Sequence, residues 1–323
     1  MSFFVLSFLK LIRIQNLLII AFTQYMVRWC LIYPILKVRN YDLQLSNFHF
    51  FLLVLSTVML AAAGYIINDY FDVRIDKVNK PERLVIDKGV KRRVAMGAHT
   101  FINILAILIG FYVSYAIGIW KLSIIHIICA STLWFYSTHF KRQFLIGNFI
   151  VAFFTAMVPL IVGIYELYPC YKAYASLGVE LSFRAVWVYV FAVSFFAFIT
   201  TLLREIIKDI EDYQGDKEYG CQTLPIVIGK QNAKIVVAVI SFACMICLSY
   251  LQYRQFKAHD WLAFFYFILA LQLPFVFLIY KTLTAQTKKD FRFAANTAKL
   301  IMLMGVFFLF IFACTLLSYI HAI

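Results

Sequence analysis

The stretch Phe48–Ile67, FHFFLLVLSTVMLAAAGYII, has no Lys, Arg, Asp or Glu, and Asn68–Asp76, NDYFDVRID, follows it directly. A helix of about twenty apolar residues is long enough to cross the hydrocarbon core of a bilayer, which is about 30 Å thick. The polar segment then begins where the helix leaves the hydrocarbon. These two segments together predict a transmembrane helix that ends in a cluster of carboxylates.

Similar apolar stretches recur along the whole chain. Of its 323 residues, 63% are hydrophobic and only 14% are charged, whereas soluble domains carry about a quarter charged residues. The sequence therefore predicts an all-α integral membrane protein with about nine transmembrane helices, as one domain over residues 1–323. The expected spans are Leu17–Leu36, Phe48–Ile67, Ala98–Gly118, Leu122–Phe140, Phe144–Tyr165, Ala185–Leu203, Ile235–Tyr253, Trp261–Leu283 and Ala298–Ile320.

The basic residues are distributed unequally between the two faces. When alternate loops are assigned to opposite faces, the face that holds the N-terminus receives 22 Lys and Arg and the other face receives 8. The positive-inside rule then predicts a cytoplasmic N-terminus and an external C-terminus. No cleavable signal peptide is evident in the sequence, so the first span is expected to be retained. The expected location is a bacterial or archaeal cell membrane. Basic residues at membrane edges also suit anionic lipid headgroups or a phosphorylated substrate. Nucleic acid is not expected as a partner, because no nucleic-acid motif accompanies the charge.

The cysteines and histidines do not point to a site. The seven cysteines are irregularly spaced, and most lie in apolar spans, where Cys packs as a small hydrophobe. Cys244 and Cys247 have C-x-x-C spacing but are expected inside a span without other ligands. The six histidines show no metal-ligand spacing.

Two polar windows, Asn68–Gly97 and Arg204–Lys234, follow the second and sixth expected spans. They contain 11 of the 16 acidic residues. This matching placement suggests two four-helix pseudo-repeats plus a ninth helix, arranged around a central cavity onto which equivalent helix ends converge.

Each window carries carboxylates at helical spacing. The first cluster has side chains spaced i, i+4 and i+8: Asn68, Asp72 and Asp76. The second has side chains spaced i, i+4, i+7 and i+11: Glu205, Asp209, Asp212 and Asp216. On one continuous helix the first set would occupy an arc of about 80° and the second an arc of about 60°. Each cluster is therefore expected to direct its oxygens to one side.

Stacked carboxylates at a membrane edge need a counter-charge, because they repel one another and are costly to desolvate. One interpretation is that they are solvated helix ends paired with basic neighbours, namely Arg74, Lys77, Arg204 and Lys208. The other is that they hold Mg²⁺, which is commonly bound by one or two carboxylates together with phosphate oxygens. Two such clusters on one face favour magnesium and a diphosphate.

A diphosphate becomes a good leaving group when its developing charge is neutralised. If it departs from an allylic carbon, the remaining cation needs a dry cavity with aromatic walls. The chain has 34 Phe and 20 Tyr, so an apolar helix bundle can provide such a cavity.

Several motifs resemble those of the UbiA superfamily of intramembrane prenyltransferases. Asn68-x-x-x-Asp72-x-x-x-Asp76 followed by Asn79-x-Pro81-x-Arg83 resembles its first aspartate motif. Asp212-x-x-x-Asp216 followed by Thr223-Leu224-Pro225-Ile226-x-x-Gly229 resembles its second. Tyr136-Ser137-x-x-x-Lys141-Arg142 and Gly147-Asn148 match the segment between them, and Arg13-Ile14-Gln15-Asn16-Leu17 is similar to the first-helix signature.

The resemblance covers nearly the whole chain and implies a Mg²⁺-dependent enzyme that moves a polyprenyl group from its diphosphate to a lipophilic acceptor. The metal ligands expected from both the spacing and the resemblance are Asn68, Asp72, Asp76, Asp209, Asp212 and Asp216. The residues expected to act in catalysis are Asp72, Asp76, Asp212, Asp216 and Tyr136, whose phenol would steady the allylic cation. The residues expected to contact substrate are Asn16, Asn68, Arg83, Lys141, Arg142 and Lys208.

The acceptor is suggested by a finer likeness. Arg204–Asp212, REIIKDIED, resembles the geranylgeranylglyceryl-phosphate geranylgeranyltransferases, which favours a glycerol-phosphate ether lipid over a quinone-precursor ring or haem. Arg83-Leu84 departs from the Arg-Pro that is usual in the superfamily.

Two other classes of protein compete with the transferase. A cation-coupled transporter would place its carboxylates near the bilayer midplane, on helices broken by Gly or Pro. A CDP-alcohol phosphotransferase would resemble an Asp-Gly-x-x-Ala-Arg pattern, which this chain lacks.

Overall fold

The computed structural model describes residues 2–175 and 182–321, with the side chains of residues 2, 3, 83 and 319–321 outside the description. Within these ranges the chain is almost entirely helical and contains no β-strand. Eight helical segments among the described residues are long and apolar enough to cross a membrane, which confirms the predicted fold class. They are Ile14–Val38, Asn47–Asn79, Arg92–Ala116, Ile146–Ala175, Arg184–Glu211, Lys230–Lys257, Trp261–Thr284 and Lys288–Ser318.

The expected count of nine spans is not confirmed. The stretch predicted as Leu122–Phe140 forms α6 (Ile124–Thr138), a helix of 15 residues. At 1.5 Å per residue it is about 22 Å long, which is shorter than a hydrocarbon core. Short 3₁₀ turns, η3 (Trp120–Ser123) and η4 (Phe140–Arg142), take up the residues on either side.

The chain packs into two compact units. The first comprises Met1–Gln24, Leu43–Arg142 and Ile164–Leu181, and the second comprises Tyr25–Asp42, Gln143–Gly163 and Ser182–Ile323. The units interleave along the sequence, so they do not coincide with its two halves. Each unit nevertheless contains one of the two acidic clusters, and the organisation as a single domain stays a prediction.

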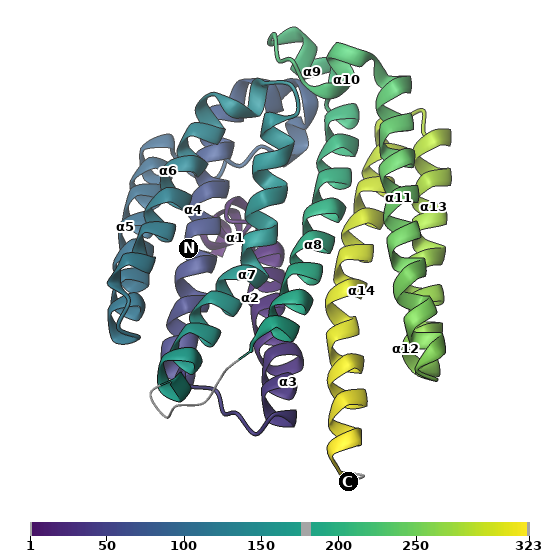
Figure 1. Ribbon diagram of the computed structural model, residues 1–323. Coiled ribbons are helices and arrows are strands. Elements are labelled where there is room, and N and C mark those ends of the chain that lie inside the picture. The colour runs from purple at the N-terminus through teal and green to yellow at the C-terminus, as the bar shows by residue number, and fades with distance from the viewer. Residues whose placement is uncertain (1, 176–181, 322–323) are drawn as a thin grey trace. The chain divides into compact units, whose positions relative to one another are not determined.

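The first unit is built around a long helix, α4. Its elements are α1 (Ser2–Leu11), the start of α2 (Ile14–Val27), α4 (Asn47–Asn79), η2 (Pro81–Arg83), α5 (Arg92–Ala116), η3, α6, η4 and the end of α7 (Ile146–Ala175). Helix α4 packs against α5 and α6 (Figure 1). Close packing against α6 depends on Gly64, where an added Cβ would lie 3.2 Å from the Leu133 side chain. Small residues allow helices in lipid to approach closely in this way.

Helix α4 carries the first acidic cluster out of the apolar region because of its length. It begins after Ser46, whose hydroxyl accepts a hydrogen bond from the backbone N–H of His49 at 3.2 Å. Such an N-cap satisfies one of the free N–H groups at a helix start. The helix continues for 33 residues, about 50 Å at 1.5 Å per residue. This exceeds the hydrocarbon thickness, so Asn68, Asp72 and Asp76 lie on the same helix as the apolar span.

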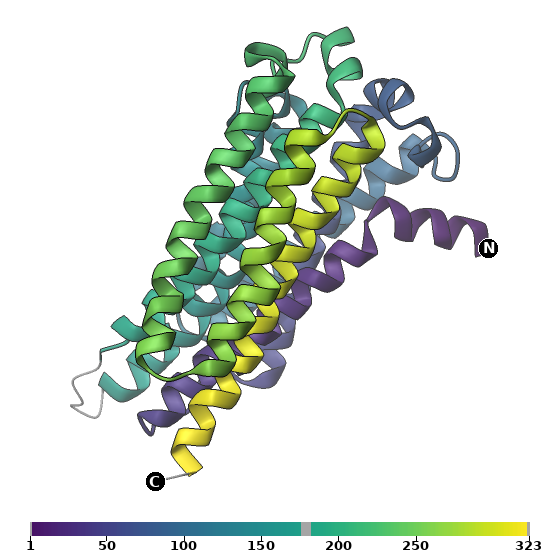
Figure 2. The ribbon, with the colours of Figure 1, turned by 90° about the vertical axis from the view of Figure 1, so that its right-hand side faces the viewer.

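The second unit contains the remaining helices. Its elements are the end of α2, η1 (Arg28–Ile32), α3 (Tyr33–Val38), the start of α7, α8 (Arg184–Glu211), α9 (Tyr213–Glu218), α10 (Leu224–Ile228), α11 (Lys230–Lys257), α12 (Trp261–Tyr266), η5 (Phe267–Gln272), α13 (Leu273–Thr284) and α14 (Lys288–His321). Helix α14 packs along α8, and α13 packs against α11 and α14, as Figure 2 shows for the last three. At Gly305 an added Cβ would lie 2.2 Å from the ring of Phe196, so this glycine permits the α8–α14 contact.

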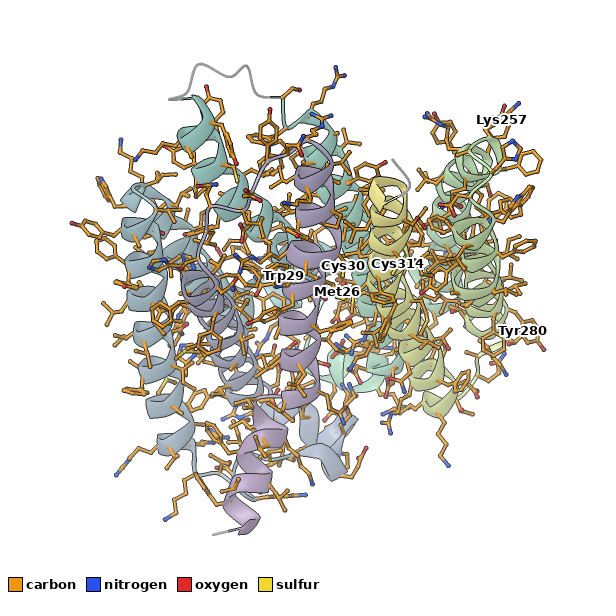
Figure 3. The ribbon with its side chains drawn as sticks, turned by 90° about the horizontal axis from the view of Figure 1, so that it is seen from below. Met26, Trp29, Cys30, Lys257, Tyr280 and Cys314 are labelled. Atoms are coloured by element: carbon orange, nitrogen blue, oxygen red, sulfur yellow. The ribbon has the colours of Figure 1, made fainter. Side chains whose placement is uncertain are left out.

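The seven cysteines are all free thiols. Met26, Cys30 and Cys314 lie close together in the second unit (Figure 3), with 3.8 Å between the sulfur atoms of Cys30 and Met26. Cys244 and Cys247 lie on α11 among its apolar residues, consistent with their expected position inside a span.

Candidate active site

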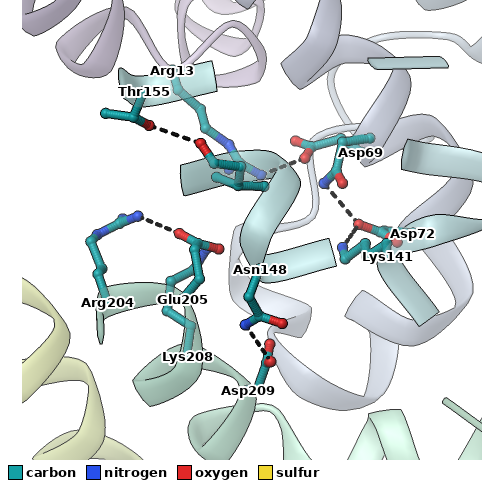
Figure 4. Close-up of polar contacts among 12 residues, drawn as sticks. Arg13, Asp69, Asp72, Lys141, Asn148, Thr155, Arg204, Glu205, Lys208 and Asp209 are labelled. Atoms are coloured by element: carbon teal, nitrogen blue, oxygen red, sulfur yellow. Dashed lines mark hydrogen bonds and ion pairs between the residues drawn. The ribbon is translucent and has the colours of Figure 1, made fainter. Parts of the chain in front are cut away.

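Asp72 is the centre of the first cluster. It is 4% exposed and accepts hydrogen bonds from two groups, the side-chain amide of Asn68 at 2.8 Å and the ammonium of Lys141 (Figure 4). Asn68 lies one helical turn before Asp72, which confirms that the i, i+4 spacing places the two side chains together. A buried carboxylate is stable only when it is paired and hydrogen-bonded, and Lys141 and Asn68 provide this.

Lys141 reaches Asp72 from η4, immediately after α6. Burial by itself lowers the pKa of this ammonium, but the negative charge of Asp72, with smaller contributions from Tyr136 and Asp76, raises the pKa well above its ordinary value. Lys141 is therefore a fixed positive charge at the cluster. The neighbouring Arg142 is exposed, and among the described residues its side chain makes no ion pair.

Asn68 and Asp76 flank Asp72 along α4. The side-chain oxygen of Asn68 is buried and has no hydrogen-bond partner among the described residues. Asp76 is half-buried and lies close enough to Asp72 for the two charges to repel. An unpaired amide oxygen beside two carboxylates is a set of hard oxygen donors that suits a small divalent cation.

Asp69 belongs to a separate interaction. Its carboxylate pairs with the Arg13 guanidinium at 2.7 Å, and this guanidinium lies 4.8 Å from the centre of the Tyr65 ring. Arg13 has a φ of +52°, in the left-handed region that costs a non-glycine residue energy. It sits at the bend between α1 and α2, visible in Figure 2. Sequence reasoning assigned Arg13 no role, although the first-helix signature includes it.

The second cluster does not form one helical face as expected. Helix α8 ends at Glu211, Asp212 adopts φ −91° and ψ 5°, and Asp216 lies on the short helix α9. Helix α8 ends here because Asp212 and Gly215 follow it, and Asp and Gly are poor helix formers. Asp212 and Asp216 are half-buried and remain linked by a 3.2 Å hydrogen bond from the backbone N–H of Asp216 to the carbonyl of Asp212.

Glu205 is engaged by cations of its own helix. Its carboxylate accepts from Arg204 at 2.8 Å and from Lys208 at 2.7 Å. The interpretation that basic neighbours neutralise the acidic residues therefore holds for Glu205. Lys208, expected to contact substrate, donates to Glu205.

Asp209 is held by a residue from another helix of the same unit. The side-chain amide of Asn148, on α7, donates to the Asp209 carboxylate at 2.7 Å (Figure 4). Asn148 is 7% exposed. The arrangement parallels that of Asp72 and Asn68, because in each unit an amide fixes the carboxylate. Sequence reasoning quoted Gly147-Asn148 as a matching motif but assigned it no role.

The other predicted residues are dispersed. Tyr136 is half-buried near the end of α6, and its phenol interacts electrostatically with Lys141. Asn16 is half-buried in the first turn of α2. Arg83 lies in η2, and its side chain falls outside the described residues.

The residues of the first cluster fit a magnesium ion that is held by only one or two protein side chains. Within the described part of the chain, no three His, Cys, Asp or Glu side chains surround one point closely enough to hold a metal ion. Along α4 the physical reason is that i and i+8 lie about 12 Å apart, so Asn68 and Asp76 cannot both reach one ion. Mg²⁺ is usually bound by one or two carboxylates with water and substrate phosphates completing its shell. Asp72 with Asn68, or Asp72 with Asp76, meets that requirement.

Comparisons with known proteins agree with these observations. A model of the UbiA prenyltransferase family matches residues 40–308. The digeranylgeranylglyceryl phosphate synthase of Methanosphaera stadtmanae is 28% identical over 259 residues, 80% of this chain and 86% of the relative. The protein of the same name from Methanococcoides burtonii is 28% identical over 303 residues, 93% of this chain and 99% of the relative.

Solved structures support the fold. One, of digeranylgeranylglyceryl phosphate synthase in membranes, has a TM-score of 0.60 at 23% identity and covers 97% of this chain and 99% of that one. Another, a UbiA homologue from Archaeoglobus fulgidus bound to GPP and Mg²⁺, has a TM-score of 0.55 at 16% identity, with coverages of 94% and 99%. At these identities the likeness establishes a shared helical fold.

Proposed function

Because the chain belongs to the UbiA prenyltransferase family, we propose that it transfers a geranylgeranyl group from its diphosphate to a glycerol-phosphate ether lipid. It is an integral membrane prenyltransferase, and the choice of donor and acceptor is the proposal. Relatives named digeranylgeranylglyceryl phosphate synthase support this choice, as does the segment Arg204–Asp212. Family membership also favours a transferase over a transporter or a CDP-alcohol phosphotransferase.

The observation that carries the proposal is the pair of amide-held carboxylates. Asp72 is buried and fixed by Asn68 and Lys141 in the first unit, and Asp209 is fixed by Asn148 in the second. A carboxylate that an amide already orients does not have to reorganise when charge develops on its ligand, so it is suited to a highly charged ligand. We propose that each cluster engages Mg²⁺ and diphosphate oxygens at the cytoplasmic edge of the membrane.

Mg²⁺ ions would be held by members of the first cluster, Asn68, Asp72 and Asp76, and by members of the second, Asp209, Asp212 and Asp216. They would neutralise the charge that develops on the leaving diphosphate. Lys141 adds a fixed positive charge at Asp72. Tyr136 lies beside Lys141 and would steady the allylic cation with its phenol.

The reaction forms one C–O bond and breaks another. The acceptor hydroxyl oxygen attacks the allylic carbon of the donor, the bond from that carbon to the diphosphate oxygen breaks, and the hydroxyl proton passes to the departing diphosphate. The chain's residues hold charges and exclude water. They are not consumed.

The proposal is tested with purified protein, Mg²⁺, geranylgeranyl diphosphate and geranylgeranylglyceryl phosphate, with the ether product read by lipid mass spectrometry and diphosphate release measured in parallel. We expect product from the wild-type chain, none after chelation of Mg²⁺, and none from Asp72→Ala or Asp212→Ala. A preference for an aromatic quinone precursor or haem would refute the acceptor. Undiminished turnover in either variant would refute a role for the replaced carboxylate in the reaction.

A further inference from the structure

The hairpin of α13 and α14, inside the second unit, carries an aromatic layer and a basic layer near its connecting turn. The two helices run antiparallel and lie side by side, as Figure 2 shows, and residues 285–287 join them. Phe277 on α13 and Phe293 on α14 meet with their ring centroids 5.9 Å apart. Residues four apart share a helix face, so Lys281 and Lys289, each one turn nearer to the connection, face one another at the next level.

The ammonium of Lys281 lies among aromatic rings. Its nitrogen is 5.5 Å from the centre of the Phe277 ring and 5.7 Å from that of Phe293. The ring of Tyr280 is centred 5.8 Å away. Rings at these distances attract a cation and hold it in place, but they leave its three N–H donors for other acceptors. Among the residues that the structure describes, no group forms a hydrogen bond or ion pair with this ammonium.

The carboxylate that lies nearest to Lys289 in the sequence is committed to the turn. Asp290 accepts from the backbone N–H groups of Gln286 at 3.1 Å and Thr287 at 2.9 Å, and from the Thr287 hydroxyl at 2.9 Å. The backbone N–H of Asp290 donates to that hydroxyl in return, so the two residues form a capping box that starts α14. The charge of Asp290 also acts on Lys281, but the two groups form no ion pair. Asp290 therefore fixes the shape of the turn and leaves the Lys281 donors available.

The carbonyl groups at the end of α13 have a cation of their own. Lys234, a buried residue of α11, donates to the Ala285 carbonyl at 2.6 Å and to the Leu283 carbonyl at 3.4 Å. A basic side chain in this position satisfies free carbonyls and compensates the helix dipole. Neither Lys281 nor the exposed Lys289 is needed for that purpose.

The aromatic layer is exposed on segments that are able to span a membrane. Phe277 and Tyr280 belong to the segment Trp261–Thr284, Phe293 belongs to Lys288–Ser318, and all three rings are exposed. Tyr280 projects outward from the helices in Figure 3. Exposed rings on such segments meet lipid, and tyrosine is typical of the level of the headgroups. The lysine layer, one turn closer to the end of each helix, then lies at the headgroups themselves.

We propose that Lys281 and Lys289 bind the phosphate of an anionic bilayer lipid, whose acyl chain lies along Phe277 and Phe293. The charges are complementary, because anionic headgroups attract basic side chains at a membrane edge. The rings hold the Lys281 ammonium in position before the lipid arrives, so little side-chain freedom is lost on binding. This site is independent of the choice of prenyl donor and acceptor.

A lipid at this site would hold the end of the second unit that carries the acidic cluster. Arg292, which is adjacent to Phe293, donates to Glu211 at 3.0 Å. Glu211 is the last residue of α8 and immediately precedes Asp212. The ion pair therefore connects the start of α14, where the lipid binds, to the helix end from which the second cluster begins.

The experiment measures lipid binding to the purified, delipidated chain in a neutral detergent by native mass spectrometry. Phosphatidylglycerol and phosphatidylcholine with identical acyl chains are the two probes. We expect the wild-type chain to bind phosphatidylglycerol about twentyfold more tightly. Lys281→Gln and Lys289→Gln should each reduce this preference about fivefold, the contribution of one basic residue near a membrane surface. Lys281→Arg should keep the preference because it keeps the charge.

Lys288→Gln is the matched control, because it removes the same charge from the neighbouring position. Lys288 lies one turn before Arg292 on α14 and so shares the face that is directed toward α8. We expect this variant to change the preference less than twofold, and thermal unfolding in the same detergent checks that each variant is folded. Equal losses in all three glutamine variants would indicate diffuse attraction and overturn the site, as would a wild-type chain without a preference. Displacement of bound phosphatidylglycerol by equimolar geranylgeranyl diphosphate would assign the lysines to the substrate and overturn the lipid site.

Discussion

Replacing Asp72 by Asn removes the negative charge that Lys141 and Asn68 share while it preserves the shape of the side chain. The Asp72 side chain is 6% exposed and that of Lys141 is 36% exposed, so the ion pair is partly screened by solvent. With that discount, the loss lowers the free energy of unfolding by about 1–2 kcal/mol. The effect on catalysis is larger, because a group that stabilises transition-state charge is removed. We expect kcat to fall about a hundredfold to a thousandfold.

The assay is diphosphate release at saturating donor and acceptor, with thermal unfolding in the same detergent. Asp69→Asn is the matched control, because it removes an equal charge from the adjacent position, where Asp69 pairs with Arg13 at 2.7 Å. We expect a similar loss of stability but a fall in kcat of less than about tenfold. The double-mutant cycle of Asp72→Asn with Lys141→Gln should give a coupling of about 1 kcal/mol. Equal effects of Asp69→Asn and Asp72→Asn on kcat would refute the assignment.

Three further substitutions test other parts of the structure. Gly110→Ala places a Cβ 2.5 Å from the buried His126 ring, so thermal unfolding should show a loss of about 1–3 kcal/mol of stability. The control Gly97→Ala, on the same helix with open space around it, should stabilise the protein by about 0.5–1 kcal/mol. Similar losses of stability in both variants would contradict the close approach of Gly110 to His126. Asn148→Ala removes the 2.7 Å hydrogen bond to Asp209 and should lower kcat about tenfold to hundredfold. Asn232→Ala, which removes an exposed amide that donates to the Ile228 carbonyl, is the control. Unchanged turnover in Asn148→Ala would rule out an orienting role for Asn148. Glu211→Gln weakens the 3.0 Å contact with Arg292, whose side chain is 34% exposed, and should cost about 1 kcal/mol of stability with little effect on kcat. A loss of kcat without a loss of stability would instead show that Glu211 takes part in the reaction.

Sequence reasoning identified most of the first cluster but misjudged the second. The spacing of Asn68 and Asp72 predicts a contact because one uninterrupted helix, α4, contains both. The same reasoning assumed that Glu205 through Asp216 continue one helix, and the break at Asp212 separates them. A helical wheel is valid only while the helix continues, and where a polar helix end stops depends on its tertiary surroundings.

The sequence by itself determined the class of protein. Apolar stretches of membrane-spanning length indicate that the chain is surrounded by lipid, and acidic residues at their ends indicate where charge gathers; both are local properties of the chain. Tertiary structure decided the partners of those acidic residues. Lys141 reaches Asp72 across 69 positions, and Asn148 reaches Asp209 across 61. Periodicity along one helix gives the direction of a side chain, whereas the group that meets it comes from a helix packed alongside, which only the folded chain brings into place.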